Sequence, residues 1–305
     1  MPTRFTRRYA RIARTLSRLD LMRTSMDEDF GADDLQLVDK DAGRRFLDFY
    51  GDEGIRIALE RYGFFAKLQQ RGYHDFALTT KASAERHTLI VSGRSTEEPE
   101  RVRLMELLVR REHMVPEPAP GLPALGKGYE ALTVDWLVLQ HPRGTFSPQR
   151  PRLPGQDMPG LGVAEMVLTL LERVVARLEL DALIGVPEHF HNAELYVRGM
   201  PYFDPWYLGQ LRALEGALLV EEGLSLAQAA WAIEWGQVRA RDGTRFLWKG
   251  HPMIWPRHPE LVAYLDDATY ASEARRAADA YRFSLDRPAF QASWAREKPA
   301  LVGWK

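Results

Sequence analysis

Hydrophobic residues recur along the chain at two kinds of spacing, and these spacings predict an alternation of helices and strands. Near the start, apolar residues three and four positions apart define one face of a helix. They are Phe5, Tyr9, Ile12, Leu16 and Leu19. Residues 51–71 repeat the helical spacing, and Gly72 is suited to end that helix. The pattern therefore predicts two helices before the first strand.

The next part of the chain has the composition of β-strands, and its strand-like runs are short. Residues 75–81 and 87–93 are two strand-like runs joined by a polar turn around 84–86, which predicts a hairpin. Residues 101–115 fit either a helix or a long strand. Residues 131–140 are nearly all apolar and rich in β-formers, which predicts a buried central strand.

Strands and helices alternate in the middle of the chain. After a loop rich in Pro, Arg and Gly, a helix is predicted at 162–178, a strand at 180–187 and a short helix at 190–199. Residues 202–204 are suited to start a further strand. Together with the strand at 131–140, this order predicts an α/β unit in which the strands on either side of a helix are parallel.

The last hundred or so residues have a different character. Helices are predicted at 205–222, 225–235 and 258–282, and residues 241–244 contain the Asp-Gly pair of a type I′ turn. Seven of the eight tryptophans lie here: Trp206, Trp231, Trp235, Trp248, Trp255, Trp294 and Trp304. Such enrichment marks either a binding face or the core of a small module, and the short helices favour a core.

These patterns divide the chain into three expected parts. They are an N-terminal helical arm at 1–41, an α/β core at 42–204 and a Trp-rich helical and hairpin module at 205–305. In the arm, a cluster of arginines precedes a run of acidic residues. The arm is either a basic amphipathic helix for a membrane or RNA, or a helix docked on its own domain. The acidic run would repel a phosphate-rich partner, which favours docking.

Composition narrows the chemistry. The chain has 305 residues, 45% hydrophobic and 27% charged, with a net charge of −1, which is typical of a globular protein without a basic nucleic-acid surface. The absence of cysteine excludes disulfides, thiolate metal sites and cysteine nucleophiles. No apolar run approaches the roughly 18 residues of a membrane span, and the N-terminus lacks the apolar core of a secretory signal peptide. We therefore expect a soluble, cytoplasmic protein with no membrane or nucleic-acid partner.

The loop before the helix at 162–178 is the most informative for function. Gly160 and Gly162 allow close backbone approach, and the first helical turn offers unbonded N–H groups, which together suit a pyrophosphate. The spacing is neither a P-loop nor the G-x-G-x-x-G turn of dinucleotide-binding folds. Close packing of the helix on its strand would explain the same two glycines.

The segment 131–204 resembles the core of the GCN5-related N-acetyltransferase (GNAT) superfamily. In that family a strand leads to a Gln/Arg-x-x-Gly-x-Gly/Ala turn, and a later short helix has the form Asn-x-x-Ala-x-x-Leu-Tyr-x-x-x-Gly-Phe. Gly160-Leu161-Gly162 matches the turn, and Ala193, Leu195 and Tyr196 match the later helix. Asp157 stands at the Gln/Arg position, one residue after Gln156, and His189 stands where Asn is usual.

The resemblance implies an α/β (α+β mixed-sheet) fold and an acyl-CoA-dependent N-acyltransferase that moves an acyl group from acetyl-CoA or another acyl-CoA to an amine. Coenzyme A would lie between the strands at 131–140 and 180–187. The residues expected to bind it are Leu139, Gln140, Gln156, Gly160, Leu161, Gly162, His189 and Asn192. A backbone N–H near Leu139 or Gln140 would polarise the thioester carbonyl. The alternative is a GNAT-fold protein that binds a ligand or partner without transfer.

By the same resemblance, Tyr196 would protonate the leaving thiolate. The family has no fixed base, and the local choices are Glu188, His189, His191 and Asp135. Tyr196 would otherwise be a packing residue, and Glu188 a helix cap. A metal site could form from Glu188, His189 and His191 only if the backbone there is extended. No H-E-x-x-H motif supports such a site, so no metal is expected.

Overall fold

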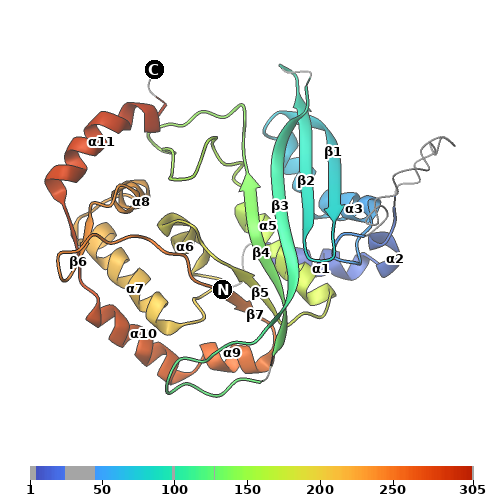
Figure 1. Cartoon of the computed structure of the whole chain (residues 1–305). Helices are drawn as coiled ribbons and strands as arrows, with labels where there is room; N and C mark the ends of the chain where they lie inside the picture. Colours follow the sequence, from blue (N-terminus) through green and yellow to red (C-terminus); the bar gives the residue numbers. More distant parts are fainter. Residues whose placement is uncertain (1–4, 25–44, 98–99, 127, 304–305) are drawn as a thin grey trace.

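A mixed six-stranded sheet forms the centre of the molecule, described here by a computed structural model over residues 5–24, 45–97, 100–126 and 128–303. Its order is β1-β2-β3-β4-β5-β7. The strands are β1 (Tyr73–Ala82), β2 (His87–Ser95), β3 (Val102–Met114), β4 (Tyr129–Leu139), β5 (Ala182–Gly185) and β7 (Met253–Pro256). Figure 1 shows this mixed α/β architecture, with a helical C-terminal region beside the sheet.

The pairing of the strands confirms the predicted hairpin and the predicted parallel pair. Strands β1 to β4 form an antiparallel meander, and β4 and β5 are parallel. The ambiguous residues 101–115 form the strand β3. Strand β7, which the sequence pattern did not predict, pairs antiparallel with β5. Chain from both sides of residue 204 therefore contributes to one sheet.

Helices α1 (Thr6–Thr15), α3 (Asp52–Tyr62) and α5 (Ala164–Arg177) pack against one face of the sheet. The helix predicted at 51–71 is broken at Gly63, whose φ of +84° ends α3 before α4 (Phe64–Gln69) begins. The first predicted helix is also broken, because Ser17 and Asp20 form a capping box that starts α2 (Arg18–Leu21). Leu19, predicted on the apolar face, is 78% exposed.

The N-terminal helix docks on the domain, as predicted. Tyr9 is fully buried, and its ring centre lies 4.7 Å from that of Tyr62. Arg177 of α5 donates to the carbonyl oxygens of Ala13 and Leu16 at 2.7 and 3.0 Å, which fixes the end of α1. In the described part of the chain, no helix combines the length and apolarity needed to cross a membrane.

The C-terminal region consists of short helices and a small second sheet. Its elements are α7 (Pro205–Glu215), η1 (Gly216–Glu221), α8 (Leu226–Glu234), β6 (Val238–Ala240), α9 (Pro259–Leu265), α10 (Ala268–Ala280), β8 (Phe283–Leu285) and α11 (Arg287–Leu301), and the short helix α6 (Phe190–Tyr196) precedes them after β5. The helix predicted at 258–282 is wrong as one element, because Asp267 caps a new helix by accepting from the Thr269 N–H. Helix α11 was not predicted.

Two predicted β features are present only in part. Residues 202–204 form no strand, and Tyr202 contributes a single bridge to Met253. The turn at 241–244 exists, with φ of +82° at Gly243. Across this turn Arg239 of β6 forms a bridge with Arg245, and the ladder partner of β6 is β8.

Candidate functional site

The site begins where β4 and β5 separate. The two strands pair only from Ala131 with Ala182 to Val134 with Gly185, and β4 then continues to Leu139 with β3 as its partner. A cleft of about 410 Å³ opens beyond this point. Its walls are the second half of β4, the loop at 153–162, the residues after β5 and helix α6.

This cleft contains every residue that the sequence analysis assigned to catalysis or coenzyme A binding. They are Leu139, Gln140, Gln156, Gly160, Leu161, Gly162, Glu188, His189, His191, Asn192 and Tyr196. They come from three separate stretches of chain, which the β4–α5–β5–α6 order brings around one opening. Asp135 also lines it.

The glycine turn closes onto the end of β4. Gly160 forms a bridge with Gln140, and the Leu161 N–H donates to the Leu139 carbonyl at 3.4 Å. The Gln140 N–H donates to the Leu104 carbonyl at 3.0 Å. The sequence analysis expects a backbone N–H near Leu139 or Gln140 to polarise the thioester carbonyl, and of these the Gln140 N–H is already used within the sheet.

Helix α5 presents its N-terminus at the same turn. Gly162 has a φ of +73°, and no side chain caps the helix at Val163. The Val167 N–H to Val163 carbonyl bond, at 3.0 Å, starts the helical ladder. The N–H groups of the first turn therefore have no partner within the helix. Their partial positive charge, at the rim of a cleft, is favourable for an anion.

An arginine that the sequence analysis missed, Arg71, lies beside this turn, and Arg143 lies beside Gly72. A Cβ on Gly162 would lie 3.1 Å from Nη2 of Arg71, and one on Gly72 would lie 2.9 Å from Nη1 of Arg143. Burial, together with the charges of Arg71 and Arg143, lowers the pKa of His141. Arg143 also pairs with Glu97. No local motif marks Arg71, because it reaches the turn from 91 positions earlier in the sequence.

The residues before the glycine turn do not place a free negative charge in the cleft. The Asp157 side chain is 92% exposed and pairs with Arg152 at 3.0 Å. The Gln156 side chain accepts from the Leu153 N–H at 3.2 Å, so its oxygen is used within the loop at 153–162. The acid at the family's Gln/Arg position is thus neutralised by a neighbouring arginine.

Two histidines stack at the opposite wall. The ring centres of His189 and His191 are 5.4 Å apart, with planes 10° from parallel. His191 is only 3% exposed, and its Nδ1 has no hydrogen-bond partner among the described residues. Burial, and then the neighbouring His189, lower the pKa of His191 to about 4. His191 is therefore a neutral ring at physiological pH.

His189 has a carboxylate partner that the sequence analysis missed. Its Nδ1 lies 3.4 Å from Oε2 of Glu234, at the end of α8. The opposite edge of the ring lies against Gly155, where a Cβ would overlap Nε2. The imidazole is thus held between a carboxylate and a glycine. Glu234 lies 45 positions after His189, in a part of the chain where no motif was recognised.

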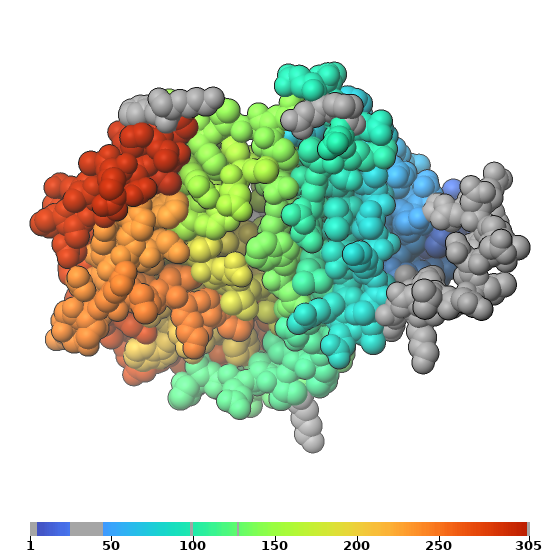
Figure 2. All heavy atoms as spheres, turned by 45° about the horizontal axis from the view of Figure 1, so that its top comes forward, coloured from blue at the N-terminus to red at the C-terminus, as the bar shows by residue number. Residues whose placement is uncertain are grey.

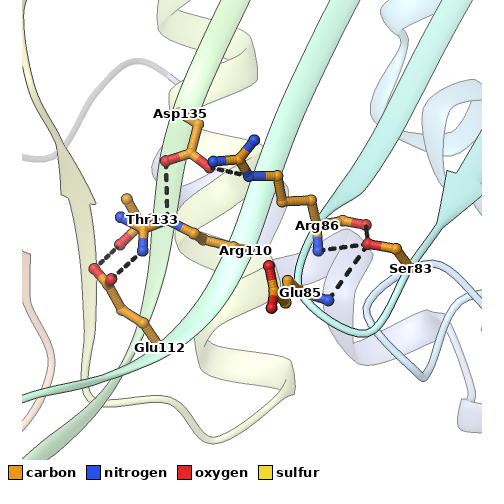
Figure 3. Close-up of polar contacts among 7 residues, drawn as sticks. All are labelled: Ser83, Glu85, Arg86, Arg110, Glu112, Thr133 and Asp135. Carbon is orange, nitrogen blue, oxygen red and sulfur yellow. Dashed lines mark hydrogen bonds and ion pairs between the residues drawn. The ribbon is translucent and has the colours of Figure 1, made fainter.

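Asp135 is the extra residue of a bulge in β4. Leu108 pairs with Trp136 and Val109 with Val134, so Asp135 has no partner residue in β3. Its carboxylate receives Arg110 at 3.0 Å and lies 3.9 Å from Arg86. Figure 3 shows both guanidinium groups directed at this carboxylate, and Glu112 bound to Arg110 and Thr133. Two cations therefore already engage the Asp135 carboxylate.

Glu188 and Tyr196 lie at opposite ends of α6. Glu188 is exposed, and no side chain caps the helix, so the interpretation of Glu188 as a cap is wrong. Tyr196 is half-buried and also packs against the core. Burial raises the pKa of Tyr196, so its hydroxyl keeps its proton at neutral pH. The structure is compatible with both roles of Tyr196, as packing residue and as proton donor.

The C-terminal region completes the cleft by holding one of its loops. Trp231 of α8 donates from Nε1 to the Arg152 carbonyl at 2.7 Å. The Arg152 N–H donates to the carbonyl of Leu301, in α11, at 2.7 Å. Figure 2 shows the middle of the chain, in lime and yellow, between the blue and teal N-terminal part and the orange and red C-terminal part.

Within the described ranges, no group of three or more His, Asp or Glu side chains is arranged to hold a metal ion. Comparison of the chain with known protein families, with curated proteins and with solved structures finds no match.

Proposed function

We propose that the protein is an acyl-CoA-dependent N-acyltransferase, with acyl-CoA in the cleft between β4 and β5. The observation that carries the proposal is the convergence of all eleven predicted site residues on one cleft. The position of that cleft, where two parallel strands diverge beside a helix N-terminus, also supports it. The resemblance to the GNAT superfamily supplies the reaction, and its finer fold assignment is part of the proposal.

The phosphate end of coenzyme A would lie at the N-terminus of α5. The uncapped N–H groups there, with the Arg71 guanidinium beside Gly162, offer hydrogen bonds and positive charge to a pyrophosphate. Since Leu161 donates to Leu139, we assign the binding to the N–H groups after Gly162. This shifts the anion site slightly along the chain from the position that the motif implies.

The thioester would lie deeper, along the second half of β4. An amine nitrogen attacks the acyl carbon, the new C–N bond forms and the C–S bond breaks. The amine loses a proton to a base, and the leaving sulfur gains one from an acid. Tyr196, a protonated phenol on the cleft wall, is the acid in this proposal.

The base that the geometry favours is His189. Among the four candidates, Asp135 is engaged by two arginines, Glu188 is exposed, and His191 has a pKa of about 4. His189 alone has an orienting carboxylate, Glu234, on one ring nitrogen. A carboxylate beside one ring nitrogen can orient an imidazole so that the other nitrogen acts as the base.

The test has two stages that need no knowledge of the acceptor. Acetyl-CoA should raise the melting temperature of the protein, since a ligand that binds only the native state stabilises it. Incubation of the complex with a panel of amines and amino acids should then release free thiol, measured with a chromogenic disulfide. No thermal shift with acetyl-CoA, acyl-CoAs of longer chain or free coenzyme A would contradict the proposal.

A binding protein of the same shape is the second candidate, and one observation favours it. The Gln140 N–H, a donor that transfer chemistry could use, is already hydrogen-bonded within the sheet. A protein that binds acetyl-CoA but releases no thiol with any amine of the panel would support this candidate over the enzyme.

A further inference from the structure

A second cavity lies within the helix-covered side of the sheet, apart from the cleft. It has a volume of about 110 Å³ and shares no lining residue with the cleft. Its walls come from α1, α3, α5, β2 and β3, with Leu59, Leu107 and Leu171 as typical members. The lining is mostly apolar and includes the tyrosines Tyr50 and Tyr62. Its charged members are two arginines of α5, Arg173 and Arg177.

The two arginines are one helical turn apart and differ in what they bind. Arg177 donates to the carbonyl oxygens of Ala13 and Leu16 and thereby holds α1. The Nε of Arg173 is buried and has no hydrogen-bond partner among the described residues. Its Nη2 lies 3.9 Å from the Glu172 carboxylate, beyond hydrogen-bond distance. An unused cationic donor therefore adjoins an apolar cavity.

Each of these features is unfavourable by itself. Walls of an empty apolar cavity lose the dispersion contacts that a filled interior would give them. A buried donor of a charged group without an acceptor loses its hydration without compensation. One class of molecule removes both costs, namely an apolar chain that ends in an anionic acceptor. A carboxylate fits a guanidinium edge with two parallel hydrogen bonds.

We propose that this cavity binds a straight-chain monocarboxylate, with the alkyl chain among the leucines and the carboxylate on Arg173. The site stands apart from the cleft, so the proposal does not depend on the acyltransferase function. Two guanidinium groups disfavour an amine of the same length. A neutral alcohol would fill the space but leave the Arg173 donor poorly matched.

Three probes of equal chain length, short enough for a cavity of about 110 Å³, test the site on the full-length protein: butanoate, butanol and butylamine. Butanoate should raise the melting temperature in a saturable way, butanol should raise it less, and butylamine should not raise it. Calorimetry should give a single butanoate site. A protein that butanoate does not stabilise, or that butanol stabilises equally, contradicts the proposal.

Two variants separate the charge from the space. Arg173→Met keeps roughly the length of the side chain and removes the donor, so butanoate should bind about ten- to a hundredfold more weakly while butanol is unaffected. Ala58→Leu, on the α3 wall, fills the cavity and should abolish binding of both. The melting temperature of each variant without ligand shows that it is folded, and Arg173→Met removes an unmatched donor, so it should fold well. Unchanged butanoate affinity in Arg173→Met overturns the assignment of the carboxylate.

Discussion

Single side chains carry the chemistry proposed for the cleft, and Tyr196 gives the sharpest case. The substitution Tyr196→Phe removes the hydroxyl and keeps the ring packed. If the hydroxyl protonates the leaving sulfur, thiol release should fall by roughly 100- to 10,000-fold with little change in acetyl-CoA affinity. If Tyr196 only packs, the variant should keep its activity. Steady-state kinetics with the best amine of the panel distinguish the two outcomes.

His189 and Glu234 should behave as a base and its positioning residue. His189→Ala should lower kcat by about 100-fold or more without weakening acetyl-CoA binding, and added imidazole should restore part of the rate. Glu234→Gln should lower kcat less, since the imidazole is still present. His191→Gln serves as the comparison, because a ring with a pKa of about 4 accepts a proton poorly. Full activity in His189→Ala would remove this residue from the mechanism.

Glu194 should make stability depend on pH. Burial, with the nearby Glu215 carboxylate, raises the pKa of Glu194 to about 7, and its Oε1 has no partner among the described residues. A raised carboxyl pKa means that the folded state binds the proton more tightly. This stabilisation is full below the ordinary pKa of about 4.5 and is lost as the pH rises through 7.

Glu194→Gln should therefore stabilise the protein at pH 8 and have little effect at pH 5. The gain at pH 8 should be at most about 2 kcal/mol, since partial exposure reduces the penalty. Urea unfolding at the two pH values measures it. A gain of equal size at both pH values would point to repacking rather than to the ionised carboxylate.

The secondary-structure elements set the glycine turn in place, and its backbone is the feature to test. Gly162→Ala introduces a side chain at a φ of +73°, 3.1 Å from Arg71. Gly223→Ala is a matched control, because Gly223 has a φ of +65° and open space around it. Both variants should lose about 1 kcal/mol of stability or more. Only Gly162→Ala should weaken acetyl-CoA binding in calorimetry, and equal affinities would contradict the anion site.

The sequence predicted the helices and strands that have a strong local pattern. It did not predict those elements and helix ends that depend on contacts with distant parts of the chain. Alternating and apolar runs located β1, β2, β4 and the parallel partner β5. Helix ends were less predictable. Gly63 ends α3 and Asp267 starts α10, although the apolar spacing continues past both residues. Strand β7 has four residues and ends in Pro256, so it has almost no local pattern, and its partner β5 is far away in sequence.

The candidate site divides in the same way. Residues near a recognisable motif, such as Gly162 and Tyr196, were found in advance and do line one cleft. Arg71 and Glu234 were not, because each reaches the site from an element without a motif of its own. The sequence also could not show that the Gln140 N–H is already used, because an N–H at the end of a strand is available only if the neighbouring segments leave it unpaired.

At the scale of the whole molecule, the C-terminal region is part of the cleft rather than an appendage. It provides β7 to the sheet, Glu234 to His189, and two anchors for Arg152. The loop around Arg152 carries Gly155, against which the His189 ring lies. The position of the imidazole thus depends on α8 and α11 as much as on β5.

Loss of one anchor should therefore loosen the cleft while the fold persists. Trp231→Phe removes the indole N–H that donates to the Arg152 carbonyl and keeps an aromatic ring in the cluster formed by Trp231, Trp235 and Trp294. Hydrogen–deuterium exchange should rise in residues 150–157, and acetyl-CoA affinity should fall several-fold, about what the loss of one hydrogen bond gives. Trp294→Phe is the matched control, since Trp294 packs in the same aromatic cluster without contacting that carbonyl. If both variants exchange alike in 150–157, ring packing rather than the Trp231 hydrogen bond holds the loop.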